Sequence, residues 1–433
     1  MLSKEQNALL TRIGPGTPGG DLLRRYWQPV ALAEELPPGG APLPVRVLGE
    51  DLVLFRDEQG RPGLLGLHCP HRGADLSYGR LEDGGLRCLY HGWLFDRTGQ
   101  CREQPGEPAG STFCQRVRHT AYPCLEAAEL IFAYLGPGEP PLLPAYEFLT
   151  VPATQRYVNK AFHECNYLQA NEGNIDPAHL SFLHYMMQDD PSRLRLVTKD
   201  VAGTSTTTNR LYGSDTSPTI EIEETDYGVR IFTVRKVGPG EIYVRASNFI
   251  MPNLSSFPGQ TGGEGYSVNW HVPIDDTHHW KYMISFSRER ALDKEAMHRP
   301  YAANLTADHR LVRNRANRYL QDREEMRTRS FIGMGAFFPA HDAFATEGEG
   351  PIQDRTTEHL GYTDKAIILA RRQLLRAIAD VQAGKDPQHV VRDPAANRFA
   401  HHVVTSQVMP DRADWRSLWR PEGRAAPAPV AGA

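Results

Sequence analysis

Cysteine is scarce in this chain, and neither sign of charge dominates it. The 433 residues contain six cysteines, with 48 lysines and arginines against 52 aspartates and glutamates, for a formal net charge of −4. Without a basic patch, nucleic acid is not an expected partner. No apolar run reaches the roughly 18 residues of a membrane span, and the N-terminal stretch lacks a signal-peptide core. Because the cysteines show no paired pattern, we expect a reducing, cytoplasmic location rather than a disulfide framework.

Two of the six cysteines are each followed closely by a histidine. Cys69 precedes His71 by two positions, and Cys88 precedes His91 by three. A zinc finger usually takes both cysteines from one loop and both histidines from a helix, whereas here each loop supplies one of each. This order suits a Rieske [2Fe–2S] cluster, with two thiolates on one iron and two imidazoles on the other, at roughly −150 to +300 mV. A structural zinc site is the alternative, and it predicts a colourless protein.

Alternating apolar patterns surround these two motifs. They predict strands in the segments 44–49, 51–57, 63–69, 93–101, 115–122 and 130–136. We therefore expect a small antiparallel β domain over residues 41–145 that carries both motifs at one end. Residues 1–40 read as an N-terminal arm with two short helical pieces, which we expect to pack against the domain that follows.

A second group of possible metal ligands comprises Asp176, His179 and His184. Asp176 followed by Pro177 is a good helix start, because the aspartate can cap the helix and proline fits its first position. Two histidines five apart lie about 140° apart on an ideal helix. They can converge on one metal only if the helix is loosened or broken between them. Two buried histidines beside a helix cap are the alternative interpretation. Two histidines and one carboxylate would form the facial triad of non-haem Fe(II) oxygenases.

At these motifs the chain resembles the large subunit of the Rieske non-haem iron aromatic ring-hydroxylating oxygenases. The run GPIQDRTTEHLGYTD, residues 350–364, is similar to the phthalate dioxygenase and phenoxybenzoate dioxygenase branch. The resemblance implies that His179 and His184 bind a mononuclear Fe(II), and that Asp176 bridges one of them to a cluster histidine of the neighbouring subunit. It implies that the [2Fe–2S] cluster is bound by Cys69, His71, Cys88 and His91.

The third iron ligand must come from far along the chain. The candidate carboxylates are Asp342, Glu347, Glu349, Asp354, Glu358 and Asp364. Spacing does not choose among them, but the resemblance implies Asp342, with Glu347 as the second choice. His341 stands where this branch often has a polar amide. We expect Asp354 in a turn, Glu358 at the surface and Asp364 as the cap of a helix that starts near Thr363.

The remaining sequence predicts the catalytic domain, residues 146–420. Residues 190–300 alternate like a large antiparallel sheet, 306–326 read as a charged surface helix, and 363–380 read as a helix that packs on the sheet. The fold class is thus α+β, and the resemblance implies a helix-grip catalytic domain with a long C-terminal helix. Residues 421–433 read as a disordered tail.

The resemblance implies the terminal oxygenase of a multicomponent system that uses O2 and electrons derived from NAD(P)H. A separate reductase, with or without a ferredoxin, would supply the electrons, and subunits would associate head to tail as a homotrimer or stacked hexamer. The expected reaction is dihydroxylation or monooxygenation of a carboxylated aromatic substrate. O-demethylation of a methoxylated aromatic acid is an alternative, and a Rieske electron-transfer protein is an alternative of another class. Arg230 and Arg245 are the candidates for binding a substrate carboxylate.

Overall fold

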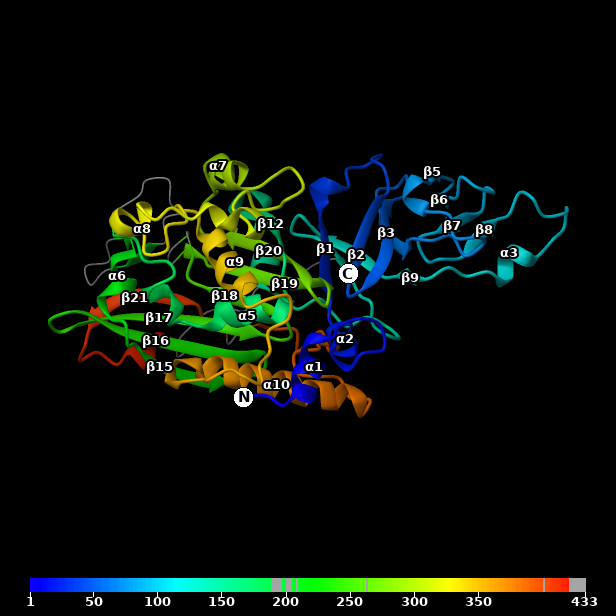
Figure 1. Ribbon diagram of the computed structural model, residues 1–433. Coiled ribbons are helices and arrows are strands. Elements are labelled where there is room, and N and C mark those ends of the chain that lie inside the picture. The colour runs from blue at the N-terminus through cyan, green and yellow to red at the C-terminus, as the bar shows by residue number, and fades with distance from the viewer. Residues whose placement is uncertain are drawn as a thin grey trace.

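The computed structural model describes residues 1–187, 197–199, 205–207, 209–259, 261, 264–399 and 402–419. The chain forms an N-terminal β domain and a larger C-terminal domain built on one sheet (Figure 1). This architecture confirms the expected α+β class. The expected tail, 421–433, lies outside the described residues. None of the helices in the described residues has the length and apolar character needed to cross a membrane.

The N-terminal arm contains two helices, α1 (Lys4–Thr11) and α2 (Pro18–Leu23). Ser3 caps α1 in a capping box with Gln6, which explains where this helix begins. The arm contacts both domains, because α1 and α2 pack against the C-terminal helix α10 (Lys365–Gln382) while Arg24 pairs with Glu50 at 2.8 Å. The arm therefore connects the β domain with helix α10 of the C-terminal domain.

The β domain consists of three small antiparallel sheets. The first sheet contains β1 (Gln28–Leu32), β11 (Leu130–Ala133) and β10 (Cys124–Ala127). The second contains β2 (Leu43–Val47), β3 (Glu50–Arg56), β4 (Pro62–Gly66) and β9 (Ala121–Tyr122). The third contains β5 (Arg80–Glu82), β6 (Gly85–Arg87), β7 (Leu94–Asp96) and β8 (Cys101–Glu103). The loops that carry the two Cys–His motifs connect β4 to β5 and β6 to β7. Cys69 and Cys88 belong to the same apolar core as Phe55 and Phe95.

A ten-stranded sheet forms the centre of the C-terminal domain. Eight strands follow one another across the sheet in the order β12 (Arg156–His163), β20 (His278–Phe286), β19 (Ser267–Asp275), β18 (Leu254–Phe257), β17 (Glu241–Ile250), β21 (Thr405–Pro410), β13 (Val197–Lys199) and β14 (Ser205–Thr207). Two more strands branch from β17: β16 (Gly228–Gly238) pairs with β17, and β15 (Thr219–Glu224) pairs with β16. All of these pairs are antiparallel except β13 with β21. The large antiparallel sheet expected for this region is therefore present.

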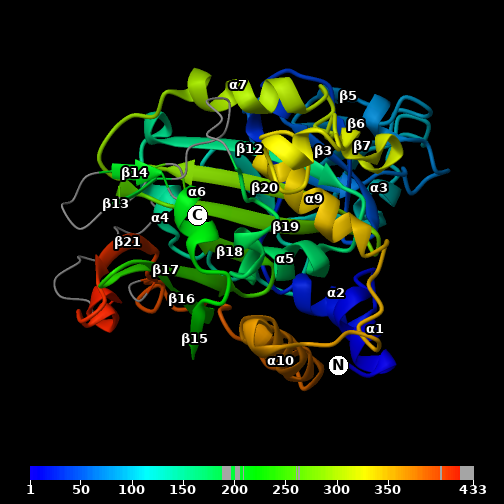
Figure 2. The same ribbon diagram turned by 60° about the vertical axis from the view of Figure 1, so that its left-hand side comes forward.

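Helices cover this sheet and position the site. Helix α10 runs along its β15–β16 end, whereas α5 (Tyr167–Ile175) and α9 (Phe338–Gly348) lie beside β18 to β20 (Figures 1 and 2). Of the residues that the helical period predicts on the buried side of α10, Ile367, Leu374 and Ile378 are buried and Leu375 is partly buried. Further helices are α4 (Glu147–Thr150), α6 (Asn209–Ser214), α7 (Lys294–Asn304) and α8 (Glu325–Thr328), with α3 (Phe113–Arg116) in the β domain.

The charged helix expected over residues 306–326 is wrong. The segment instead forms turns and a short 3-10 stretch, Arg315–Leu320, with positive φ at Arg318, Tyr319 and Leu320. Asn314 and Asn317 bond to backbone groups in this segment, and such side chains compete with helix formation. The irregular path inserts Leu311 and Tyr319 into a second apolar core.

The two domains share one continuous apolar core. Phe132 of the β domain packs on Trp270 of the large sheet with ring centroids 5.6 Å apart, and both belong to the same buried cluster. The backbone N–H groups of Leu48 and Gly49 donate to the carbonyls of Pro273 and Ile274 at 2.9 and 2.8 Å. The β domain is therefore held firmly on the catalytic sheet.

Candidate functional site

The two Cys–His loops have the same backbone hydrogen-bond pattern. In the first loop, Gly73 N–H donates to Cys69 C=O at 2.8 Å and Cys69 N–H donates to Ala74 C=O at 2.8 Å. In the second, Gly92 N–H donates to Cys88 C=O at 3.0 Å and Cys88 N–H donates to Trp93 C=O at 2.9 Å. Both glycines have positive φ, 77° and 72°, which explains glycine at these turns. Two separate stretches of sequence thus form matching loops.

The loops separate their thiols from their imidazoles. Cys69 and Cys88 are 2% and 3% exposed, whereas His71 and His91 lie at the surface with ring centroids 4.4 Å apart. The Trp93 ring stacks on His71 at 4.4 Å. Burial, with the neighbouring Cys88 as a smaller cause, raises the pKa of Cys69 to about 11. A metal cluster that replaces the thiol proton fits this donor set, with its imidazole side facing outward.

The second group of candidate residues begins where α5 ends. Asp176 is the C-cap of α5, and its carboxylate accepts a hydrogen bond from Ala178 N–H at 2.7 Å, so it does not cap a following α-helix. His179 starts a three-residue 3-10 helix, and the backbone leaves helical geometry at Phe182 (φ −124°, ψ −63°). This break between His179 and His184 confirms the loosening that their spacing requires.

The structure brings His179, His184 and Asp342 together. One potential ligand atom from each lies within 4.8 Å of the others. Asp342 is on α9, and its Oδ1 lies 3.0 Å from His184 Nε2, although the two residues are 158 positions apart in sequence. Phe338, at the start of α9, stacks on the His184 ring with centroids 3.4 Å apart and planes at 9°. Helix α9 therefore holds both the carboxylate and one histidine ring.

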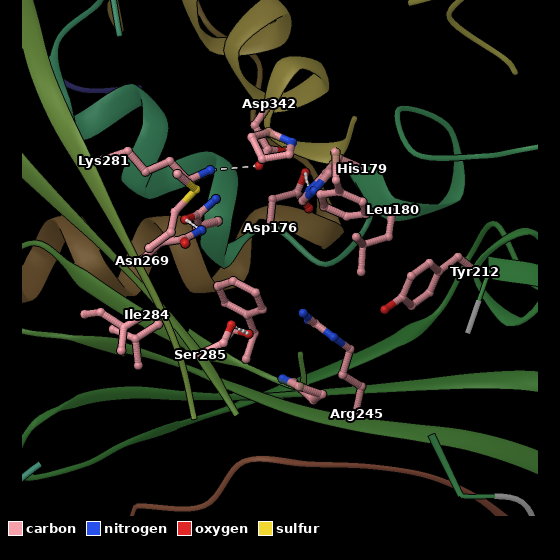
Figure 3. A pocket seen from close by; sticks show the side chains of 18 of the residues that line it. Asp176, His179, Leu180, Tyr212, Arg245, Asn269, Lys281, Ile284, Ser285 and Asp342 are labelled. Carbon is pink, nitrogen blue, oxygen red and sulfur yellow. Dashed lines mark hydrogen bonds and ion pairs between the residues drawn. The ribbon is translucent and has the colours of Figure 1, made fainter. Parts of the chain in front are cut away.

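A buried lysine completes the surroundings of Asp342. Lys281 of β20 is 2% exposed, and its Nζ donates to Asp342 Oδ2 at 3.0 Å (Figure 3). Burial opposes ionisation of Asp342, but the Lys281 cation and the hydrogen bond with His184 outweigh it and hold the pKa well below its usual range. Burial lowers the pKa of His184 well below its ordinary value, so this imidazole is neutral near pH 7. Two imidazoles and one carboxylate fit a divalent iron.

Asp176 lies beside this triad. Its Oδ2 lies 3.6 Å from His179 Nδ1, which is longer than a hydrogen bond. The Asp176 side chain is 22% exposed and that of His179 is 19% exposed. Burial raises the pKa of Asp176, but His179 and the backbone N–H of Ala178 outweigh this and lower it below its ordinary value. An ionised, partly exposed carboxylate therefore lies beside a candidate ligand.

The triad opens into a cavity with mainly apolar walls and a cation on the far side. Figure 3 shows Arg245 and Tyr212 pointing into the cavity opposite His179 and Asp342. Apolar walls come from Leu180, Phe257, Val268, Met283, Ile284 and Phe338. Arg245 is 6% exposed, and its Nη1 donates to Ser247 Oγ at 3.4 Å. Among the described residues, its Nε has no hydrogen-bond partner and its guanidinium forms no ion pair. The cavity suits a ligand with an apolar body and an acceptor group.

Two of the sequence candidates lie away from this cavity. Arg230 does not line it and pairs with Glu223 at 2.8 Å. Glu347, the second choice for the third ligand, accepts hydrogen bonds from Glu164 N–H at 3.0 Å and from the Tyr319 hydroxyl. Glu347 is also on α9, but five positions after Asp342, so it faces another side of the helix.

Sequence reasoning missed Lys281 and misplaced Glu358. A lysine in the middle of the apolar segment HHWKYMISF was the available signal for Lys281. Glu358 is not at the surface, because its side chain is 8% exposed and pairs with Arg371. Asp364 precedes α10 as expected, although its carboxylate bonds to Gly361 N–H and not to the helix.

Comparison with known proteins assigns a family description to each domain. Residues 26–122 match the family described as Rieske [2Fe-2S] domain, and residues 133–427 match LigXa C-terminal domain like. The chain is 38% identical over 403 residues to the phthalate 4,5-dioxygenase oxygenase subunit of Pseudomonas putida, covering 89% of this chain and 88% of that protein. It is 35% identical over 408 residues to the 5,5'-dehydrodivanillate O-demethylase oxygenase subunit of Sphingobium sp. (strain NBRC 103272 / SYK-6), covering 92% and 85%.

Solved structures share the fold at lower identity. Dicamba monooxygenase bound to dicamba aligns with a TM-score of 0.58 at 18% identity, over 84% of this chain and 99% of that one. The terminal oxygenase of carbazole 1,9a-dioxygenase from Novosphingobium sp. KA1 aligns with a TM-score of 0.55 at 21% identity, over 82% and 94%. The β domain and the large antiparallel sheet thus occur together in other proteins.

Proposed function

The chain belongs to the Rieske non-haem iron oxygenases as an oxygenase subunit, and from this premise we propose which residues serve each metal centre. The matching loops support a [2Fe–2S] cluster bound by Cys69, His71, Cys88 and His91. The convergence of His179, His184 and Asp342, which carries the proposal, supports a mononuclear Fe(II) site. When bound, the cluster supplies single electrons and the mononuclear iron supplies O2 activation.

The protein residues determine where O2 and substrate bind and how the two metal centres are coupled. His179, His184 and Asp342 would hold the iron, and the cavity that His179 and Asp342 line would admit O2 and substrate. Asp176 is the bridging carboxylate in this proposal, because it is ionised, beside His179 and partly exposed. A carboxylate that accepts a ring N–H from an imidazole on each side orients both rings and couples the two centres.

The proposed substrate is an aromatic carboxylate. Arg245 supports this class, since a buried guanidinium without a carboxylate partner among the described residues can bind one bidentately. The apolar walls between Arg245 and the triad would hold the aromatic ring. The relatives' names agree with this class, because they include phthalate, phenoxybenzoate and 3-chlorobenzoate dioxygenases. The reaction is then dihydroxylation or monooxygenation of the ring.

O-demethylation is the second candidate reaction. It is favoured by the 35% identity to the 5,5'-dehydrodivanillate O-demethylase oxygenase subunit. Insertion of one oxygen into a methoxyl C–H bond gives a hemiacetal that loses formaldehyde, so the same ligands serve both reactions. Formaldehyde release therefore distinguishes this reaction from ring hydroxylation.

Electrons would cross between subunits of a homotrimer or stacked hexamer. Strands β5–β8, next to the Cys–His loops, lie at the opposite side of the molecule from α9 (Figure 1). The loop tip exposes Leu89 and Tyr90, at 60% and 57%, and near His179 the chain exposes Phe182 and Phe331, at 49% and 45%. These apolar surfaces support head-to-tail packing of the cluster loops of one subunit against Asp176 of the next. An NAD(P)H-dependent reductase, with or without a ferredoxin, would reduce the cluster.

Oxygen consumption with a panel of aromatic acids tests the proposed reaction. We expect substrate-dependent O2 uptake with a chemical reductant and mediator, and a hydroxylated or demethylated product. Mass spectrometry of products formed under 18O2 would identify the inserted oxygen atoms. A protein that cycles its cluster but consumes no O2 with any aromatic acid would instead be an electron-transfer protein.

A further inference from the structure

A second cavity lies next to the cavity into which the triad opens. Its lining includes Tyr157, Asn159 and Tyr301, and among the described residues Tyr301 is the one that lines both cavities. The exposed Glu34 and Ala302 also line the second cavity, so it reaches solvent. The first cavity is the smaller of the two, at about 80 Å³ against about 370 Å³. A ligand longer than one aromatic ring therefore needs space beyond the first cavity.

The two cavities are neighbours across the pairing of β12 with β20. Tyr157 of β12 pairs with Ser285 of β20, and Asn159 of β12 pairs with Met283 of β20. In each pair the β12 residue lines the second cavity and the β20 residue lines the first. Because paired strands lie about 4.8 Å apart, the second cavity begins about one strand spacing beyond the first.

Tyr301 closes the first cavity on the side away from Arg245. Arg245 is on β17, and from there the sheet continues through β18, β19 and β20 to β12. Three strand spacings, about 14 Å in total, separate β17 from β20, where the two cavities adjoin. A ligand that binds Arg245 through a carboxylate and spans the first cavity therefore points its other end toward Tyr301.

The Tyr301 ring is held by two other aromatic rings. It contacts the Phe337 ring edge to face, with centroids 5.5 Å apart and planes at 89°, and the Tyr157 ring with centroids 5.7 Å apart. The Tyr157 hydroxyl in turn accepts a hydrogen bond from Asn159 Nδ2 at 3.0 Å. Tyr301 is 7% exposed and is the one buried residue of α7. The ring therefore has a defined position between the two cavities.

We propose that Tyr301 is a specificity-determining residue whose ring ends the substrate cavity and limits the length of the aromatic acid that binds. The inference rests on the proposed substrate class, and it adds which residue sets the size of the substrate within that class. Removal of the ring would join the two cavities and give a second aromatic ring access to the larger one. The Tyr301 hydroxyl has no part in this role, because the ring itself separates the cavities.

Equilibrium binding measures this role without turnover. Under anaerobic conditions the holoenzyme is titrated by calorimetry with benzoate and with biphenyl-4-carboxylate, which differ by one ring. We expect wild type to bind benzoate more tightly. Y301A and Y301L should bind biphenyl-4-carboxylate about 10–150-fold more tightly than wild type does, which corresponds to the burial of one more aromatic ring. Benzoate affinity should stay close to that of wild type.

Two further features keep the comparison controlled. Y301F keeps the ring and loses only the hydroxyl, so it should match wild type with both acids. Y301L keeps an apolar side chain in the core, and it replaces Y301A in the comparison if alanine at this position prevents folding. The melting temperature verifies the folding of each variant.

The outcomes separate this inference from the proposed substrate class. Unchanged affinity for biphenyl-4-carboxylate in folded Y301L, or the same gain in Y301F, would overturn the role of the Tyr301 ring. Equal affinity of wild type for the two acids would overturn it as well. If neither acid binds wild type or Y301L, the proposed substrate class fails, and this inference fails with it. A gain in Y301L, together with benzoate binding that R245Q weakens, supports both.

Discussion

A buried ion network ties α5 to the C-terminal helix, and its loss should measurably destabilise the protein. Glu172 on α5 accepts from Arg355 Nη2 at 2.8 Å and from Arg371 Nε at 2.6 Å. The side chains of Glu172, Arg355 and Arg371 are 8%, 0% and 4% exposed. In E172Q, Arg371 keeps its ion pair with Glu358, whereas among the described residues Arg355 is left with neutral hydrogen-bond partners, the new amide and the side chain of Asn7 at 3.2 Å. The variant therefore leaves one fully buried cation without a carboxylate.

Breaking one partner of a buried pair costs about 3–5 kcal/mol of unfolding free energy. With an unfolding entropy of about 2.1 cal/mol/K per residue, each kcal/mol corresponds to about 1 °C in a chain of this size. We therefore expect E172Q to melt about 3–6 °C below wild type by calorimetry. The matched control is E224Q, which removes the exposed partner of Arg376 (44% and 56% exposed) and should change the unfolding free energy by at most about 1 kcal/mol.

The pH dependence of this difference has a defined sign. Burial raises the pKa of Glu172, but Arg355 and Arg371 outweigh burial and lower it below its ordinary value. A carboxyl with a lowered folded-state pKa stabilises the fold above its unfolded-state pKa, about 4.3, and loses this contribution as pH falls through the folded-state pKa. The melting difference between wild type and E172Q should therefore be full near pH 7 and shrink in acid. Equal melting temperatures of E172Q and E224Q near pH 7 would refute the reasoning.

Three further predictions concern catalysis. R245Q should raise KM for an aromatic carboxylate about 10–150-fold, which is the equivalent of about 1.5–3 kcal/mol for a lost charged hydrogen bond. The control R230Q lies outside the cavity and should leave KM unchanged. Equal steady-state KM values for R245Q and R230Q would contradict the role of Arg245. D176N should retain its full iron content but reoxidise its reduced cluster at least about tenfold more slowly in stopped flow with O2 and substrate, since the amide is uncharged and replaces one of the two acceptor oxygens with an NH2 donor. Wild-type reoxidation would exclude the bridge. C88A and H179A should each be inactive alone. When the two chains are assembled together, part of the O2 uptake should return if electrons cross between subunits. A mixture that assembles normally but stays inactive would place electron transfer within one chain.

Sequence reasoning worked best for features whose residues lie close together in the sequence. The Cys–His loops and the pair His179 and His184 are local, so spacing and coordination chemistry were enough to propose their grouping. Asp342 joins that pair only through the packing of α9, and nothing in the spacing separates it from Glu347 on the same helix. Only the resemblance to a family selected Asp342.

The missed features depend on tertiary contacts. Strands β12 and β21 were not predicted, and β21 follows the long helix and enters the sheet beside β17. The segment 306–326 has helix-forming charges, but burial of Leu311 and Tyr319 directs its path. Lys281 and Glu358 were unexpected in the interior because a buried charge is stable only with a partner, and their partners, 61 and 13 positions away, are not identified by sequence spacing.

Iron and acid-labile sulfide per chain test the central claim of two metal centres most directly. Wild type should contain about three irons and two sulfides, because a two-iron cluster accompanies one mononuclear iron. H179A should keep about two irons and two sulfides, and C88A should keep about one iron and no sulfide. Two irons in both wild type and H179A, or zinc in place of iron and sulfide, would contradict the account.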